Sequence, residues 1–258
     1  MRRKRFLLLL LGFGLWIAAP AAAEYIDLPV KYSQTPWDPD LYSWGGIGGQ
    51  VYMADDFVCD SSAPIVAVRW WGGYVGETVP RADGHTGPFE IRFHYSVSGK
   101  AAGYTDDHPY SLPGTQVYLD TVTAQEVFAG YADSVEFDPQ PIYRYDAMLS
   151  VPFEQWTFSQ SEDNGIEGEL WIGIHSPSLT WGWHMLDYDG CPAIPVLDYA
   201  AYSSSGALGD WQSAGPDNGT IDTDMTFELM GPVPIPAAVW LLGSGLVGLV
   251  GIRRKFNK

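Results

Sequence analysis

The sequence predicts an all-β protein, with a single antiparallel β-sandwich of jelly-roll-like type between an N-terminal signal peptide and a C-terminal transmembrane sorting helix. Two observations predict this organisation. Gly and Pro recur through the middle of the 258-residue chain, and the runs between them have the two-residue period of half-buried strands. Both ends of the chain place basic residues beside an apolar run. We therefore divide the chain into residues 1–23, 24–232 and 233–258.

The N-terminus has the organisation of a secretory signal peptide. Four basic residues precede an apolar run over residues 6–17, which leads into an Ala-rich stretch. The small residues Ala21 and Ala23 form a cleavage site, so the mature chain is expected to begin at Glu24. The alternative, an uncleaved membrane anchor, is disfavoured because the apolar run is short.

The clearest strand of the body covers residues 89–97, where apolar and polar side chains alternate. Residues 123–132 could form a short helix, and no longer segment has a helical apolar stripe. About nine strands without helical crossovers favour antiparallel pairing in a sandwich or jelly roll, with a barrel as the alternative. The other expected strands cover residues 51–58, 65–71, 115–123, 142–149, 169–175, 180–185, 197–202 and 225–229.

The charge balance argues against nucleic acid as a partner. The chain has 14 basic and 31 acidic residues, a formal net charge of −17, and its basic residues cluster at the two ends. Without a basic stripe, the body cannot replace the counterions of a nucleic acid with Lys and Arg. An extracellular polysaccharide partner is expected to be neutral, or to be bound through divalent cations.

The C-terminal segment combines a Pro-rich box, an apolar helix over about residues 235–252 and a basic tail at 253–258. A helix over residues 237–252 would be about 24 Å long, slightly shorter than a hydrocarbon core of about 30 Å. The basic tail should stay in the cytoplasm. The residues that define the segment are Val233, Pro234, Ile235, Pro236 and Ala237, then Gly243, Ser244 and Gly245, then Arg253, Arg254 and Lys255.

These features resemble the PEP-CTERM sorting signal that exosortases process in Gram-negative bacteria. The resemblance implies that the Pro-rich box is the processing site and that the helix tethers the precursor to the inner membrane. It also implies that the processed protein reaches the cell surface or the extracellular space. The box reads Val-Pro-Ile-Pro where the family name has Pro-Glu-Pro, so it is similar to the Val-Pro-Leu-Pro-Ala variant. An ordinary tail anchor, with the same helix and charges, is the alternative.

The body also carries a resemblance. Residues 54–59, 65–74 and 181–184 resemble segments of an uncharacterised β-sandwich domain of exported bacterial proteins, over roughly residues 31–229. The resemblance implies a fold and an exported setting. No activity comes with it.

Two cysteines, Cys59 and Cys191, are the only ones in the chain. The signal peptide would carry them to an oxidising compartment, where a bond between them could form. Closing so long a loop is worth about 4–5 kcal/mol in the chain-entropy model. Separate thiols are the alternative, and catalysis is disfavoured because neither cysteine has a histidine close in sequence.

Acidic turns are the candidate metal sites. Asp187 and Asp189 precede Gly190 and could contribute carboxylates to a calcium site, although the same residues are ordinary in solvated turns. No other cofactor is expected, and the five histidines lack the spacing of a zinc site. Asp55 and Asp56 lie within a strand pattern, where one should face the interior or a rim, in a paired structural role rather than a catalytic one.

Two further residues have side chains of interest. His94 alternates with Phe93 and is expected to be exposed. Glu167 and Glu169 share one strand face, as the carboxylates of a retaining glycosidase would, with a solvated hairpin end as the alternative. The chain has no nucleophile elbow, P-loop or dinucleotide fingerprint.

Aromatic residues are abundant, with 11 Trp and 15 Tyr. Adjacent strand residues point to opposite faces, so at least one of Trp70 and Trp71 should leave the core face. We take Trp70, Trp71, Trp181 and Trp183 as candidates for stacking on sugar rings, with core and rim packing as the alternative. The expected function is that of a non-enzymatic structural or polysaccharide-associated surface protein, and the alternative is a secreted glycan-active enzyme.

Overall fold

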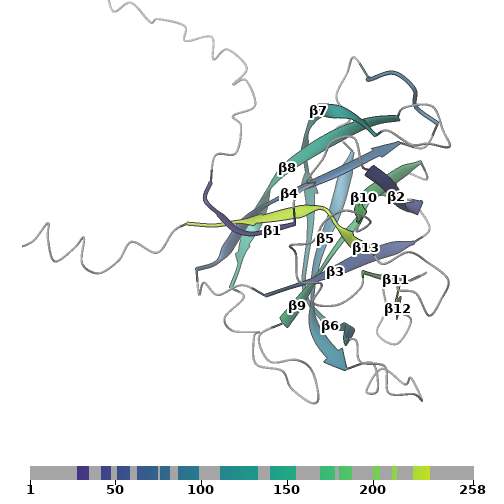
Figure 1. Ribbon diagram of the computed structural model, residues 1–258. Coiled ribbons are helices and arrows are strands. Elements are labelled where there is room, and N and C mark those ends of the chain that lie inside the picture. Colours follow the sequence, from purple (N-terminus) through teal and green to yellow (C-terminus); the bar gives the residue numbers. More distant parts are fainter. Residues whose placement is uncertain are drawn as a thin grey trace, which may run out of the picture.

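The computed structural model describes residues 28–34, 42–47, 51–58, 63–74, 76–81, 87–98, 111–132, 140–154, 169–177, 180–187, 200–203, 211–213 and 223–232. These residues form strands in two antiparallel sheets, without helices (Figure 1). The strands are β1 (Val30–Gln34), β2 (Tyr42–Ile47), β3 (Tyr52–Val58), β4 (Ile65–Tyr74), β5 (Pro88–Ser98), β6 (Ser111–Thr123), β7 (Gln125–Ala132), β8 (Gln140–Phe153), β9 (Glu169–His175), β10 (Trp181–Asp187), β11 (Ala201–Ser203), β12 (Gln212–Ser213), β13 (Thr223–Met225) and β14 (Phe227–Met230). The expectation of an all-β, sandwich-like fold is confirmed.

Sheet A has eight strands and is built around β4. One edge of β4 pairs with β8, which pairs with β7. The other edge pairs first with β14, through residues 67–70, and then with β10, through residues 72–74. β14 also pairs with β1, and β10 pairs with β2 and β13. Strand β4 therefore joins the β7–β8 side of sheet A to the side that contains β14 and β10.

Sheet B has six strands in the order β12-β11-β3-β9-β5-β6. Its longest ladder joins β5 to β6, from Pro88 opposite Thr123 to Ser98 opposite Ser111. The alternating segment at residues 89–97 lies within β5, as predicted, because Phe89, Ile91 and Phe93 fill the core face of this sheet. Val97, which follows a shift of register in the β5–β6 pair, packs instead against the cluster on the other face.

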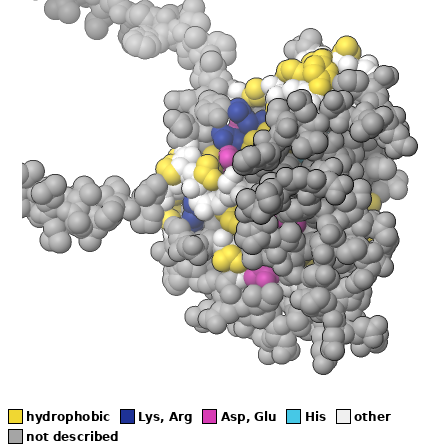
Figure 2. Space-filling model, viewed as in Figure 1, with side chains coloured by type: hydrophobic (Ala, Val, Ile, Leu, Met, Phe, Trp, Pro, Cys, Tyr) yellow, Lys and Arg dark blue, Asp and Glu magenta, His cyan; other side chains and the backbone are white. Residues whose placement is uncertain are grey.

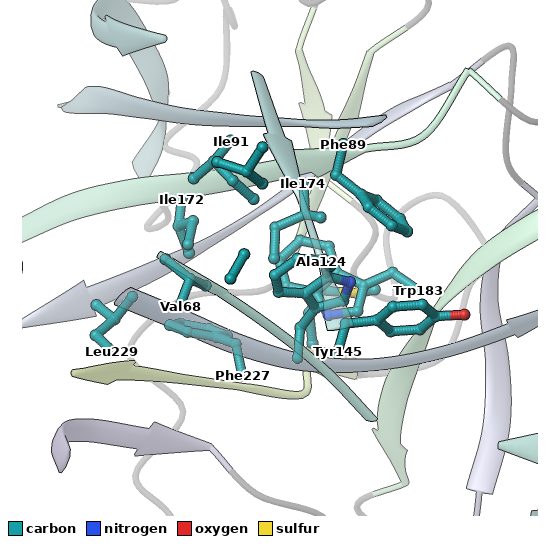
Figure 3. Packing of buried hydrophobic residues seen from close by; sticks show 14 of the residues in the cluster. Val68, Phe89, Ile91, Ala124, Tyr145, Ile172, Ile174, Trp183, Phe227 and Leu229 are labelled. Atoms are coloured by element: carbon teal, nitrogen blue, oxygen red, sulfur yellow. The ribbon is translucent and has the colours of Figure 1, made fainter. Parts of the chain in front are cut away.

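The main core lies between the sheets (Figure 3). Alternate residues of β4 and β14, such as Val68 and Phe227, meet alternate residues of β5 and β9, such as Phe89 and Ile172. Much of the contact is between aromatic rings: Trp70 stacks on Tyr145 with centroids 5.5 Å apart. This density of large rings explains why a chain rich in Trp and Tyr has few of them on the described surface.

A second, smaller core covers the outer face of sheet B, the face turned away from sheet A. Trp171 of β9 lies there with Ala54, Leu112, Ala201 and Trp211. Neighbouring residues of β9 and β3 therefore bury side chains on both faces.

The edge of sheet B is joined to sheet A by Asp120 of β6. Its carboxylate accepts hydrogen bonds from the backbone N–H of Ser150 at 2.6 Å and from the hydroxyl of Ser150 at 2.7 Å. Nearby, the Tyr118 hydroxyl donates to the carbonyl of Val151 at 2.6 Å. Burial acts to raise the pKa of Asp120, but the bonds from Ser150 outweigh it and hold the pKa below its usual value.

One expectation of local structure, a short helix, is wrong, and the two terminal segments cannot be compared with the structure. Residues 123–132 do not form a helix: they form the end of β6 and strand β7, because pairing with β8 supplies their backbone hydrogen bonds. Within the described residues no helix is long and apolar enough to cross a membrane. The expected signal peptide at 1–23 and sorting segment at 233–258 lie outside the described residues.

Candidate functional site

The tryptophans that we expected to stack on sugars are mostly interior. Trp70, Trp181 and Trp183 are buried in the main core, so these three cannot offer a ring to a polymer, and the expectation is wrong for them. Trp181 and Trp183 are two residues apart and share a face, which is the core face. Trp71 points the other way and packs, half-buried, against Ile142 on the outer face of sheet A.

A row of aromatic rings that is buried at its inner end and accessible at its outer end lies elsewhere, where β4, β7 and β8 meet. We call it the aromatic shelf and define it by the rings of Tyr74, Phe128, Tyr131 and Tyr143 with the polar side chains of Glu77, Arg81 and Glu126. Phe128 lies directly opposite Tyr143 in the β7–β8 ladder, with ring centroids 6.2 Å apart. Tyr143 in turn meets Tyr74 at 6.0 Å. Rings therefore continue from the buried end of β4 to the exposed strand β7.

A β-bulge shapes the outer part of the shelf. The β7–β8 register shifts between Phe128 and Gly130, and Gly130 has φ of 150°. Without the extra residue, Phe128 and Tyr131 would point to opposite faces, because they are three positions apart. With it, both rings are on one face, with centroids 5.2 Å apart.

Polar side chains border the inner part of the shelf. The Tyr74 hydroxyl donates to Glu126 at 3.3 Å, and the Arg81 guanidinium lies 3.9 Å from the centroid of the Tyr74 ring. The Tyr143 hydroxyl accepts from the backbone N–H of Arg81 at 2.9 Å and donates to Glu77 at 3.3 Å. Arg81 also forms an ion pair with Glu77. The shelf thus combines apolar ring faces with a charged rim.

Burial is the main cause of the tyrosine pKa shifts in the shelf. It raises the pKa of Tyr74 and of Tyr143, and the nearby carboxylates of Glu126 and Glu77 add to the effect. The same holds for the buried neighbour Tyr145. The phenols of Tyr74 and Tyr143 therefore stay neutral over the physiological range and act as hydrogen-bonding groups rather than as bases.

Of the two adjacent aspartates, Asp55 is the one that faces the main core. Asp55 shares the core-facing side of β3 with Met53 and Phe57, and it accepts hydrogen bonds from the backbone N–H groups of Met225, at 2.7 Å, and Asp56, at 3.1 Å. Burial, then the charges of Asp224 and Asp56, raise the pKa of Asp55 well above its usual value. The two sheets therefore meet at a buried carboxyl that favours its neutral form.

Glu169, one of the two acids that we considered for glycoside cleavage, is buried. Its carboxylate accepts hydrogen bonds from the hydroxyls of Ser96, at 2.9 Å, and Ser111. A solvated hairpin end is therefore also wrong for this residue. Glu167 lies outside the described residues.

His94 is buried, contrary to our expectation. It lies on the outer face of sheet B, but the ring of Trp211 covers it with centroids 5.4 Å apart. Its Nδ1 lies 3.1 Å from the carbonyl oxygen of Gly114. Burial lowers the pKa of His94 to about 4, with Arg92 adding to the effect, so the ring is neutral at pH 7.

Most of the residues that we considered for a metal site or a disulfide lie outside the described part of the chain. Within the described part of the chain, no three His, Cys, Asp or Glu side chains are grouped so as to hold a metal ion. Asp187 ends β10, while Asp189, Cys59 and Cys191 lie outside the described residues, as do the sorting residues.

The fold and the site define a two-sheet antiparallel β domain with an aromatic, charge-rimmed surface at one end. The chain belongs to the family described as Domain of unknown function (DUF7901), whose model matches residues 30–230. No curated protein matches the chain. No solved structure matches it either.

The shelf was missed by sequence reasoning. Its rings come from three strands, and their proximity follows from the pairing of β4 with β8 and of β8 with β7. One signal could have indicated it: Phe128, Gly130 and Tyr131 place two aromatics around a glycine, which is a typical bulge residue.

Proposed function

We propose that the chain is an exported surface or extracellular-matrix protein, structural or polysaccharide-associated and without catalysis. In this proposal the signal peptide is removed after Ala23, and an exosortase-type enzyme processes the box that begins at Val233. The precursor is tethered to the inner membrane by its C-terminal helix. The β domain then reaches the cell surface or the extracellular space.

The observation that carries the proposal is the pairing of the two terminal strands. Val30 of β1 lies opposite Met230 of β14, and the Gly231 backbone N–H donates to the carbonyl of Pro29 at 3.1 Å. The segments before β1 and after β14 therefore start from the same place on sheet A (Figure 1). This arrangement suits a precursor whose two apolar segments enter one membrane while the acidic domain stays on one side of it.

The non-catalytic part of the proposal is supported by the state of the acids. Glu169, Asp55 and Asp224 are buried and hydrogen-bonded within the fold. A retaining glycosidase needs two accessible carboxylates on either side of its substrate. The buried acids instead contribute to the structure.

Intact mass of the protein isolated from a Gram-negative host with an exosortase tests the proposal. The mature protein should begin at Glu24 and lack the helix beyond the box. Changing Pro234 and Pro236 to Ala should leave the tail attached and the protein in the membrane fraction. Pro152→Ala, at an exposed proline of β8, is the matched control and should be processed normally.

Two results would contradict the proposal. Surface-located protein that still carries residues 240–258 would identify an ordinary tail anchor. Release of reducing ends from a polysaccharide by the pure protein would identify the alternative, a glycan-active enzyme.

A further inference from the structure

The outer part of the aromatic shelf exposes two rings to solvent. Phe128 is 44% and Tyr131 is 42% exposed, and in the described part of the chain they are the aromatic members of the exposed large apolar residues. Figure 2 shows hydrophobic side chains gathered at the top of the view, where Figure 1 draws β7. Exposed rings are common singly, but two in contact on one strand form a continuous apolar face.

These rings are held in place before any ligand arrives. β7 is paired with β8 from Gln125 to Ala132, and the Phe128 ring also meets Tyr143. The bulge at Gly130 fixes both exposed rings on the same side of the strand. A ligand would therefore meet an ordered surface, which lowers the entropy cost of binding.

Hydrogen-bonding groups lie beside the rings. The Arg81 side chain is 35% exposed, and its partner Glu77 is also accessible in part. Both contact Tyr143 or Tyr74, whose rings continue the exposed pair inward. Ring faces for stacking, with a donor and an acceptor at their border, match the apolar faces and hydroxyl edges of a sugar chain.

We propose that the aromatic shelf binds a neutral polysaccharide, with Phe128 and Tyr131 stacking on sugar rings and Arg81 and Glu77 bonding to hydroxyls. This inference rests on the proposed function and names its binding site. The ligand is neutral because the chain has a net charge of −17, and the rim itself carries an Arg balanced by carboxylates. An anionic polymer would be repelled by the domain.

Affinity should be low for one site. Each stacked ring contributes about two- to tenfold, so retention depends on several domains engaging one polymer. A dense surface of processed protein would supply that multivalency.

Affinity electrophoresis of the processed mature protein through gels containing amylose, glucomannan or dextran tests the proposal, with alginate as the anionic comparison. The wild type should be retarded by at least one neutral polymer and not by alginate. Tyr131→Ala should weaken this binding by about two- to tenfold, and Phe128→Ala with Tyr131→Ala by about tenfold or more. Met148→Ala with Val151→Ala removes two exposed apolar side chains of β8 and should bind as the wild type does.

Several outcomes would overturn the proposal. One is the absence of retardation in all neutral polymers, and another is equal retardation of wild type and of the folded Tyr131→Ala variant. A third is concentration-dependent dimerisation that Tyr131→Ala abolishes, without retardation, which would assign the shelf to self-association. Terminal processing, read by intact mass, is independent of these variants, so failure of the shelf is distinguishable from failure of the proposed function.

Discussion

Arg69 and Asp146 face each other across the β4–β8 pair on the outer side of sheet A, with Nε 2.5 Å from Oδ1. Their side chains are 11% and 1% exposed. Arg69 also binds Glu228 of β14 at 2.8 Å, and Asp146 also accepts from Arg144 at 3.0 Å. This row of alternating charge links β14, β4 and β8.

Replacing Asp146 with Ala should destabilise the domain by about 3 kcal/mol, because it leaves two largely buried guanidinium groups without their shared carboxylate. Urea unfolding measures the change. Glu90→Gln is the control: Glu90 also pairs with an Arg, Arg92, but its side chain is 34% exposed. That change should cost less than about 1 kcal/mol. Equal effects would refute the importance of burial here.

Asp55→Asn should change the pH dependence of stability. The folded-state pKa of Asp55 is above the ordinary 3.8, so the folded protein holds a proton that the unfolded chain releases. Stability is therefore lost as the pH rises from about 4 towards the folded-state pKa. Relative to wild type, the free energy of unfolding of the variant should increase as the pH goes from 4 to 8.

Asp120→Asn provides a control of opposite sign. The pKa of Asp120 is lowered, so its contribution is present at neutral pH and is lost as the pH falls. Its loss should therefore destabilise the domain more at pH 7 than at pH 3. Parallel pH profiles for wild type and both variants would show that neither carboxyl acts as described.

His94 should not titrate near neutrality. Its folded-state pKa of about 4 is below the ordinary 6.5, so its protonation opposes folding as the pH falls through this window. In NMR spectra, the ring signals of His94 should keep their positions between pH 7 and pH 5.5. A midpoint between pH 6 and 7 would mean that the Trp211 cover is absent in solution.

Gly72→Ala should disrupt the junction between β4 and β10. A Cβ at Gly72 would lie 2.7 Å from the carbonyl oxygen of Gly182 and 2.8 Å from the Trp181 ring. Both contacts are too short, and the backbone of a paired strand cannot move away without breaking its hydrogen bonds. We expect a loss of about 3 kcal/mol or more, measured by thermal or urea unfolding. Gly173→Ala is the matched control in a central strand, because its nearest contact would be 3.4 Å. A neutral Gly72→Ala would show that the junction is loosely packed.

The two-residue alternation of apolar and polar side chains predicted the strands well where a strand has one buried face. β5 is the example, since its alternation is uninterrupted and its inward side chains are Phe89, Ile91 and Phe93. The same reasoning failed at residues 123–132. There an edge strand with a bulge loses the two-residue period, and pairing with β8 decides its conformation.

The site was less predictable than the fold because the exposure of a side chain depends on which other side chains cover its face of the sheet. Adjacent Trp70 and Trp71 did separate to opposite faces, as the pleat requires. Which face is open is fixed by partners far away in sequence: Trp211 covers His94, and the aromatic core encloses Trp181. No local pattern contains those contacts.

The pairing of Met230 with Ala67 gives the domain a mechanical direction. β4 runs from that end of sheet A to Tyr74 in the shelf, about 23 Å further along the strand. If a polymer pulls on the shelf while the chain beyond Met230 is held, the force runs along β4. β14 then resists in shear, with all of its hydrogen bonds to β4 loaded together. Val30 lies opposite Met230, so tension on the N-terminal end would load β1 against β14 in shear as well, whereas pulling the two terminal ends apart would open the β1–β14 pair bond by bond. Removal of the signal peptide would therefore leave one loaded end, and the tension would pass through β14 alone.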